Sequence, residues 1–152
     1  MIFTLIALLT AAANIAGCIH FKKPLVRLLL GAMAGIWLLI TAMGGWFVYE
    51  TRYRITQVDV STSPDGVYEL YFQQEGDPEW PYGYTHARLT LRKGSKTIAK
   101  RSFDVANDGA NIHDSNWGVS WESGRVSVSV KGDEQPRRYY ILYFDGKTEV
   151  KR

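Results

Sequence analysis

The pattern of apolar and polar positions divides the 152-residue chain into two parts. Residues 1–49 form two long apolar runs separated by a short cationic segment. Beyond Arg54, apolar and polar residues alternate in short stretches, which is typical of half-buried β-strands. We therefore expect a helical membrane part over residues 1–50, a juxtamembrane segment or first strand over 51–62, and an all-β domain over 63–152.

Both apolar runs are long enough to cross a bilayer as helices. As helices, Ile2–Ile19 would span about 27 Å and Leu25–Tyr49 about 37 Å, against a hydrocarbon core of about 30 Å. Pro24 suits the first turn of the second helix, where its missing N–H costs nothing. Aromatic residues near the end of the second run suit a membrane interface; they are Trp46, Phe47, Tyr49 and Tyr53. The pattern predicts a two-helix transmembrane hairpin with helices at about 2–19 and 25–49.

Small residues four positions apart occur in both runs, as Ala13 with Gly17 and as Gly31 with Gly35. Such spacing lets helix backbones approach closely in a membrane. We expect the two helices to pack against each other through these residues, or against a second copy in a homodimer. The alternative is that small residues are simply common in membrane helices.

The segment Ile15-Ala16-Gly17-Cys18 matches the lipobox at which bacterial lipoproteins are cleaved and lipidated on cysteine. The start of the chain lacks the Lys or Arg of a usual signal peptide, and a second apolar run follows soon after Cys18. We favour an uncleaved hairpin in which Cys18 is a small apolar residue. A lipoprotein lipidated at Cys18 is the alternative.

The distribution of Lys and Arg favours a cytoplasmic loop between the helices. The loop carries Lys22, Lys23 and Arg27, whereas Arg52 and Arg54 follow the second helix. The difference is small, but it predicts an extracytoplasmic C-terminal domain.

The pattern of the outer domain predicts an antiparallel meander of seven or eight strands that closes as a sandwich or small barrel. Its clearest alternating runs are Tyr68–Phe72, Ala87–Leu91, Trp117–Trp121 and Val126–Val130. Its turn signals are Ser63-Pro64-Asp65-Gly66, Lys93-Gly94-Ser95, Ser123-Gly124 and Asp145-Gly146. The segment 137–144 is aromatic on both faces and is predicted to be a central strand.

Two long loops are the candidate partner-binding segments, because long loops in compact domains are often functional. The candidate residues of the first loop are Asp77, Glu79, Trp80, Tyr82 and Tyr84. Those of the second loop are Asn107, Asp108, Asn111 and His113. Carboxylates beside aromatic rings suit a protein or a glycan. The alternative is that the rings fold back onto the sheet and the Asx side chains cap their own turns.

Motifs for catalysis and metal binding are incomplete. Asp104 and Asp108 fit a calcium-loop register around Gly109, but Ala106 stands where a ligand is required. Asp77 and Glu79 are too close in sequence to flank a glycosidic bond from opposite sides. His113-Asp114 lacks an accompanying nucleophile-elbow serine. We therefore expect that the protein is not an enzyme and that it binds no cofactor and no metal. Cys18 is the sole cysteine, which excludes an internal disulfide.

The formal net charge of +3 does not indicate nucleic-acid binding. It arises from the three cations of the membrane part, whereas bases and acids are interspersed in the outer domain. No nucleic-acid partner is expected.

The stretches SPDGVYELYF, GDPEWPYG, NDGANIHDSNWGVSW and YYILYFDGK resemble an uncharacterised family of small bacterial membrane-anchored proteins with an extracytoplasmic all-β domain. The likeness spans roughly Ser63–Lys147 and implies a short membrane anchor with an outer all-β domain. From the two apolar runs and the cationic loop, we expect a multi-pass protein of the bacterial cytoplasmic (inner) membrane. We expect a non-enzymatic envelope protein whose β-domain binds a protein or glycan partner, including an immunity role against a toxin. The alternatives are an accessory subunit of a membrane complex that binds through its helices, a lipoprotein, and a glycan-active enzyme.

Overall fold

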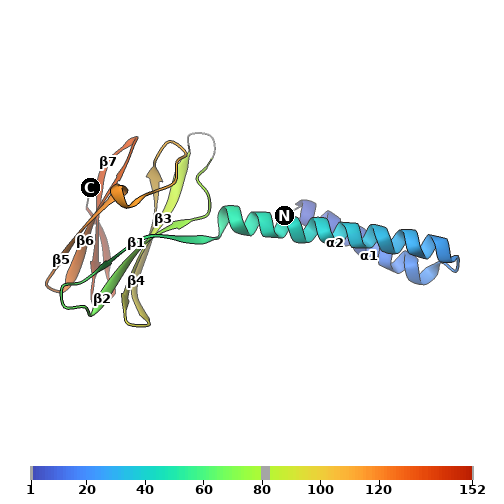
Figure 1. The fold of residues 1–152 in the computed structure, drawn as a ribbon, viewed down its shortest axis with the longest axis horizontal. Coiled ribbons are helices and arrows are strands. Elements are labelled where there is room, and N and C mark those ends of the chain that lie inside the picture. The colour runs from blue at the N-terminus through green and yellow to red at the C-terminus, as the bar shows by residue number, and fades with distance from the viewer. Residues whose placement is uncertain (1, 80–82, 152) are drawn as a thin grey trace. The chain divides into compact units, whose positions relative to one another are not determined.

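The computed structural model of the chain describes residues 2–79 and 83–151, and the chain divides into two compact units. The first unit, 1–51, contains helix α1 (Ile2–His20) and most of helix α2 (Pro24–Arg52). The described residues of the second unit, 52–152, contain eight β-strands (Figure 1). Two helices followed by a mostly β part confirm the prediction at this level.

The helical unit is held by a small set of contacts. Ala7, Ala11 and Ala34 are almost fully buried. A Cβ added at Gly17 would lie 2.9 Å from Cδ1 of Leu30, so this glycine permits the close approach of α1 and α2.

The other predicted packing residues lie on more open faces. Ala13, Gly31 and Gly35 are exposed. A Cβ added at Gly31 would meet only the Cys18 sulfur, at 3.9 Å, and one added at Gly35 would meet nothing within 4 Å. Packing of the Gly31–Gly35 face against another helix therefore stays a prediction.

Helix α2 is long and apolar enough to cross a membrane, judged by length and composition alone. The apolar part of α1 that qualifies is shorter, Leu5–His20. Large apolar side chains are exposed along both helices; examples are Leu9, Leu25, Leu28 and Leu39.

The β unit consists of two four-stranded antiparallel sheets, in which each strand pairs with its neighbours in sequence. The first sheet contains β1 (Ile55–Thr62), β2 (Tyr68–Glu75), β3 (Tyr84–Lys93) and β4 (Lys96–Ala106). The second contains β5 (Trp117–Glu122), β6 (Arg125–Gly132), β7 (Gln135–Tyr143) and β8 (Thr148–Lys151). A short 3₁₀ helix, η1 (Asp114–Asn116), precedes β5. β7 lies inside its sheet, as its aromatic residues predict.

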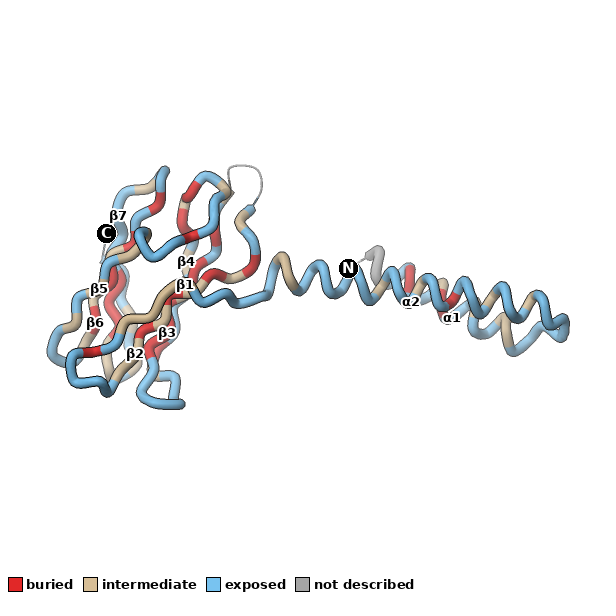
Figure 2. Tube along the Cα trace, in the orientation of Figure 1, coloured by how far each residue is buried: buried red, intermediate tan, exposed pale blue. Residues whose placement is uncertain are grey.

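The alternation of the strands builds one core shared by both sheets (Figure 2). Leu70 and Phe72 of β2 join it from one sheet, and Val126 and Val128 of β6 from the other. Three stacked ring pairs each join the two sheets, namely Tyr68 with Phe144, Phe72 with Trp117, and Phe103 with Tyr140.

The predicted Ser-Pro-Asp-Gly turn connects β1 to β2. Gly66 adopts a φ of 70°, which an L side chain rarely takes. The Asp65 carboxylate accepts hydrogen bonds from the Ser63 hydroxyl and the Val67 N–H, and these bonds lower the pKa of Asp65. The other predicted turn glycines, Gly94, Gly124 and Gly146, also have positive φ.

Candidate functional site

The two loops proposed from sequence meet at one end of the β unit. The Gly109 N–H donates to the Gly83 carbonyl at 3.0 Å, and the Thr85 hydroxyl donates to the Ala110 carbonyl at 2.7 Å. A meander explains this meeting, because the β2–β3 and β4–β5 connections leave the strands at the same end. The described parts of the two loops therefore lie side by side, and we call the surface that they form the loop end.

A buried glutamine on β2 holds this surface together. The Gln74 amide donates to the Asn111 side-chain oxygen at 2.7 Å and to the Gly76 carbonyl at 2.9 Å. Its own oxygen accepts from the Ile112 N–H at 3.1 Å. Sequence reasoning missed Gln74, although the signal was present: it follows Leu70 and Phe72 in the inward register, where an amide needs polar partners.

A groove of about 520 Å³ opens at the loop end. Three of the predicted partner-binding residues line it, namely Asp77, Asn111 and His113. Its other lining residues are Arg54, Thr56, Gln57, Val58, Asp59, Gln74, Ile112 and Asp114. The groove thus presents carboxylates, amides and an imidazole, which suit hydrogen bonds to a polar partner.

The other predicted residues that the structure describes do not line this groove. Tyr84 and Asp108 are exposed, and Asp108 has a φ of 51°, a conformation that Asp tolerates. Trp80 and Tyr82 lie outside the described residues. Glu79 contributes to a separate cluster on the first loop.

This cluster centres on His86. Its Nδ1 lies 2.7 Å from the Asp104 carboxylate, and its Nε2 lies 3.5 Å from the Glu79 carboxylate. His86 is exposed, as its place beside inward Ala87 predicts. The ring therefore connects the first loop to the end of β4.

The Asx-rich loop is organised by its own side chains. The Asn107 amide donates to the carbonyls of Ala110 and Asn111, at 3.3 and 3.0 Å. Among residues 2–79 and 83–151, the acidic, histidine and cysteine side chains form no group that could hold a metal ion. The Asn107 side chain therefore caps its own loop.

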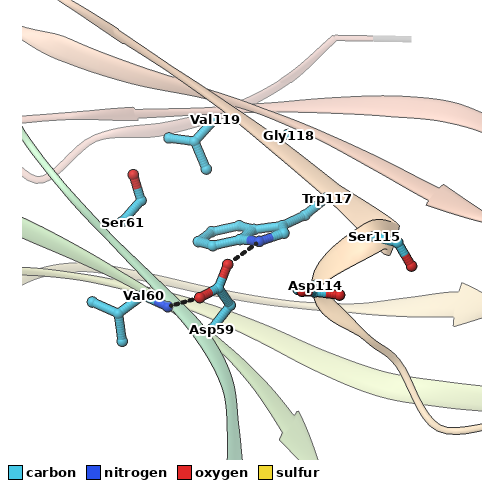
Figure 3. Close-up of a pocket in the computed structure, with 8 residues that line it drawn as sticks. All are labelled: Asp59, Val60, Ser61, Asp114, Ser115, Trp117, Gly118 and Val119. Atoms are coloured by element: carbon cyan, nitrogen blue, oxygen red, sulfur yellow. Dashed lines mark hydrogen bonds between the residues drawn. The ribbon is translucent and has the colours of Figure 1, made fainter.

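A second groove, of about 450 Å³, lies between the edge strands β1 and β5 (Figure 3). The Trp117 indole N–H donates to the Asp59 carboxylate at 3.0 Å, while the Trp121 indole N–H donates to the Ser61 hydroxyl at 2.9 Å. A register shift in β1 between Gln57 and Asp59 accompanies this arrangement. Because these polar groups already bond to each other, we regard this seam as structural.

We expect Gln74→Leu to loosen the loop end. The change leaves the buried Ile112 N–H without its acceptor, which costs about 1–3 kcal/mol. Amide hydrogen exchange of the full-length protein should therefore become faster over 107–116.

Gln57→Leu on neighbouring β1 is the matched control, because Gln57 is exposed and its loss should cost less than about 0.5 kcal/mol. Equal exchange rates in the two variants would contradict the role of Gln74.

The chain matches no protein-family model, no curated protein and no solved structure.

Proposed function

We propose that this chain is a non-enzymatic, membrane-anchored binding protein of the bacterial envelope, and that its loop end contacts a protein or glycan partner. The observation that carries the proposal is the joining of two polar loops, through Gln74, into one ordered surface with a groove. An ordered surface loses less conformational entropy on binding than two mobile loops would.

The anchor is proposed to be a hairpin of two membrane-crossing helices. Large apolar side chains on both helices remain exposed, which suits contact with lipid tails. Three residues connect α1 to α2, and the Cys18 thiol lies 3.3 Å from the Arg27 carbonyl across this turn. The contacts of Gly17 with Leu30 and of Cys18 with Arg27 support an antiparallel pair.

The orientation is proposed to follow the cationic loop, with Lys22, Lys23 and Arg27 on the cytoplasmic side. The β unit would then be extracytoplasmic. Its two sheets share one core, which supports the sandwich form over a closed barrel. Tyr53 and Arg54 connect α2 to β1.

The proposal is tested by crosslinking and pull-down of the full-length protein from membranes. Asp77→Ala with His113→Ala removes two exposed groups of the groove, so we expect the partner yield to fall about tenfold. Asp145→Ala with Lys147→Ala is the control, because this exposed pair lies in the turn at the opposite end of the sheets. The control should retain the partner.

The same experiment distinguishes the helix-mediated alternative. Gly31→Leu with Gly35→Leu fills the open small-residue face of α2. If this variant loses the partner and the loop variant keeps it, the protein is an accessory subunit that binds through its helices. Release of soluble fragments from purified cell-wall glycan by the full-length protein would contradict the non-enzymatic proposal.

A further inference from the structure

A third groove, of about 660 Å³, lies at the other edge of the two sheets, away from the β1–β5 seam. It lies between β4, an edge strand of the first sheet, and the β7–β8 pair of the second sheet. Its floor contains the stacked rings of Phe103 and Tyr140, whose centroids are 4.2 Å apart. We call it the basic groove, after the cations described next.

Arginine occupies an inward register position in both sheets at this groove. Arg101 of β4 pairs with fully buried Leu89, and Arg138 of β7 pairs with fully buried Val130. Apolar residues would be expected there, since the flanking positions of β4 hold Ala99 and Phe103. Burial raises the pKa of Tyr140, and the nearby guanidinium groups of Arg138 and Arg101 oppose that rise.

The charge of the groove is unbalanced. In the part of the chain that the structure describes, its cationic lining residues are Arg101, Arg137, Arg138 and Lys151, and its only acidic lining residue is Asp104. The Asp104 carboxylate already contacts His86 at 2.7 Å. Among the described residues, none of the four cations forms an ion pair.

Protection of a sheet edge explains only part of this arrangement. Inward charges on an edge strand discourage pairing with other chains, which would account for Arg101 on β4. β7, however, is an interior strand of its sheet, yet Arg138 holds an inward register position there. Like charges gathered in one concave site create a potential that attracts ions of the opposite sign.

We propose that the basic groove binds a phosphate-bearing linear polymer, with Arg101 and Arg138 holding phosphate oxygens and Arg137 and Lys151 contacting neighbouring phosphates. Guanidinium groups match phosphate by forked hydrogen bonds, and Lys acts as a point charge. Repeated phosphates along a chain supply one anion for each of several cations. All four cations are exposed, so a long chain has access without entering a closed cavity.

The proposal is tested with inorganic polyphosphate as the probe and the full-length protein in nanodiscs of neutral lipid. Arg101→Gln with Arg138→Gln should weaken binding about tenfold or more. Lys96→Gln with Lys131→Gln is the matched control, because it removes the same net charge from exposed sites that do not line the groove. The control should weaken binding by less than about twofold.

Arg101→Lys with Arg138→Lys keeps the charge but removes the forked donors, so its affinity should fall between those of the wild type and the Gln variant. Unchanged amide hydrogen exchange in β4 and β7 shows that each variant remains folded. Equal losses in the groove variant and the control would overturn the proposal, because binding would then depend on net charge alone.

Two further probes identify the ligand class. Poly-glutamate that binds as tightly as polyphosphate would overturn the phosphate assignment in favour of an acidic protein segment. Glycerol phosphate that binds as tightly as polyphosphate would instead assign the groove to a single lipid headgroup. The loop variant, Asp77→Ala with His113→Ala, should bind polyphosphate normally, so failure here is distinguishable from failure of the proposed function.

Discussion

Phe72→Ala is expected to lower the free energy of unfolding of the β unit by about 3–5 kcal/mol, which is the usual cost of truncating a buried aromatic residue. Phe72 is fully buried on β2, and its ring stacks on Trp117 of β5 with a centroid separation of 5.0 Å. The substitution removes a contact that joins the two sheets. The Trp117 ring cannot readily move into the space, because its N–H is held by Asp59.

The measurement is amide hydrogen exchange of the most protected core strands in the full-length protein, which reports the global free energy of unfolding. Tyr84→Ala is the matched control, because it truncates an aromatic residue of β3 that is 51% exposed. Its cost should stay below about 1 kcal/mol. If both truncations cost the same, Phe72 does not join the sheets energetically.

The strand content could be predicted because each strand of the core alternates in a short window. Leu70 and Val128 illustrate this: each has apolar or aromatic residues two positions away and polar or half-buried residues between. Burial on one face of a pleated strand imposes this local pattern. The Ser63–Gly66 turn could be predicted for a similar local reason, since Gly66 requires a positive φ.

The division of the strands into two sheets could not be read in the same way. The pairing of Trp117 with Asp59 joins residues 58 positions apart, and it involves a register shift in β1. No short window contains both partners. The partition of the meander into β1–β4 and β5–β8 depends on such distant contacts.

The sequence indicates the polar loops of the candidate site, but not the residues that hold these loops together. The polar loops stood out by their residues, and His113 and Asp77 do line one groove. The linking residue, Gln74, lies on a strand and seemed an ordinary polar end of an alternating run. Arg101 was overlooked in the same way, because its inward register becomes visible only when β4 is paired with β3.

The second large effect is expected at Gly132, the last residue of β6. Its φ is not among the positive values, so an L residue fits its backbone, and the constraint is one of space. A Cβ added there would lie 2.2 Å from the Ala106 carbonyl oxygen and 3.0 Å from a Val105 methyl. Both atoms belong to β4, so the two sheets approach each other closely at this glycine. Gly132→Ala should cost about 1–3 kcal/mol by overpacking, and Gly132→Val should prevent folding of the β unit.

Gly118→Ala separates this steric effect from the general cost of replacing a strand glycine. Its added Cβ would lie 2.9 Å from the Ser129 hydroxyl oxygen, the end of a side chain that can rotate away, so the cost should be within about 0.5 kcal/mol. Ala106 directly precedes Asn107, so Gly132→Ala should also speed hydrogen exchange across the Asx-rich loop. If the two alanine variants are equally stable, β4 must move at Ala106 to make room for the added methyl group. The loop end would then be far less rigid than its hydrogen bonds indicate.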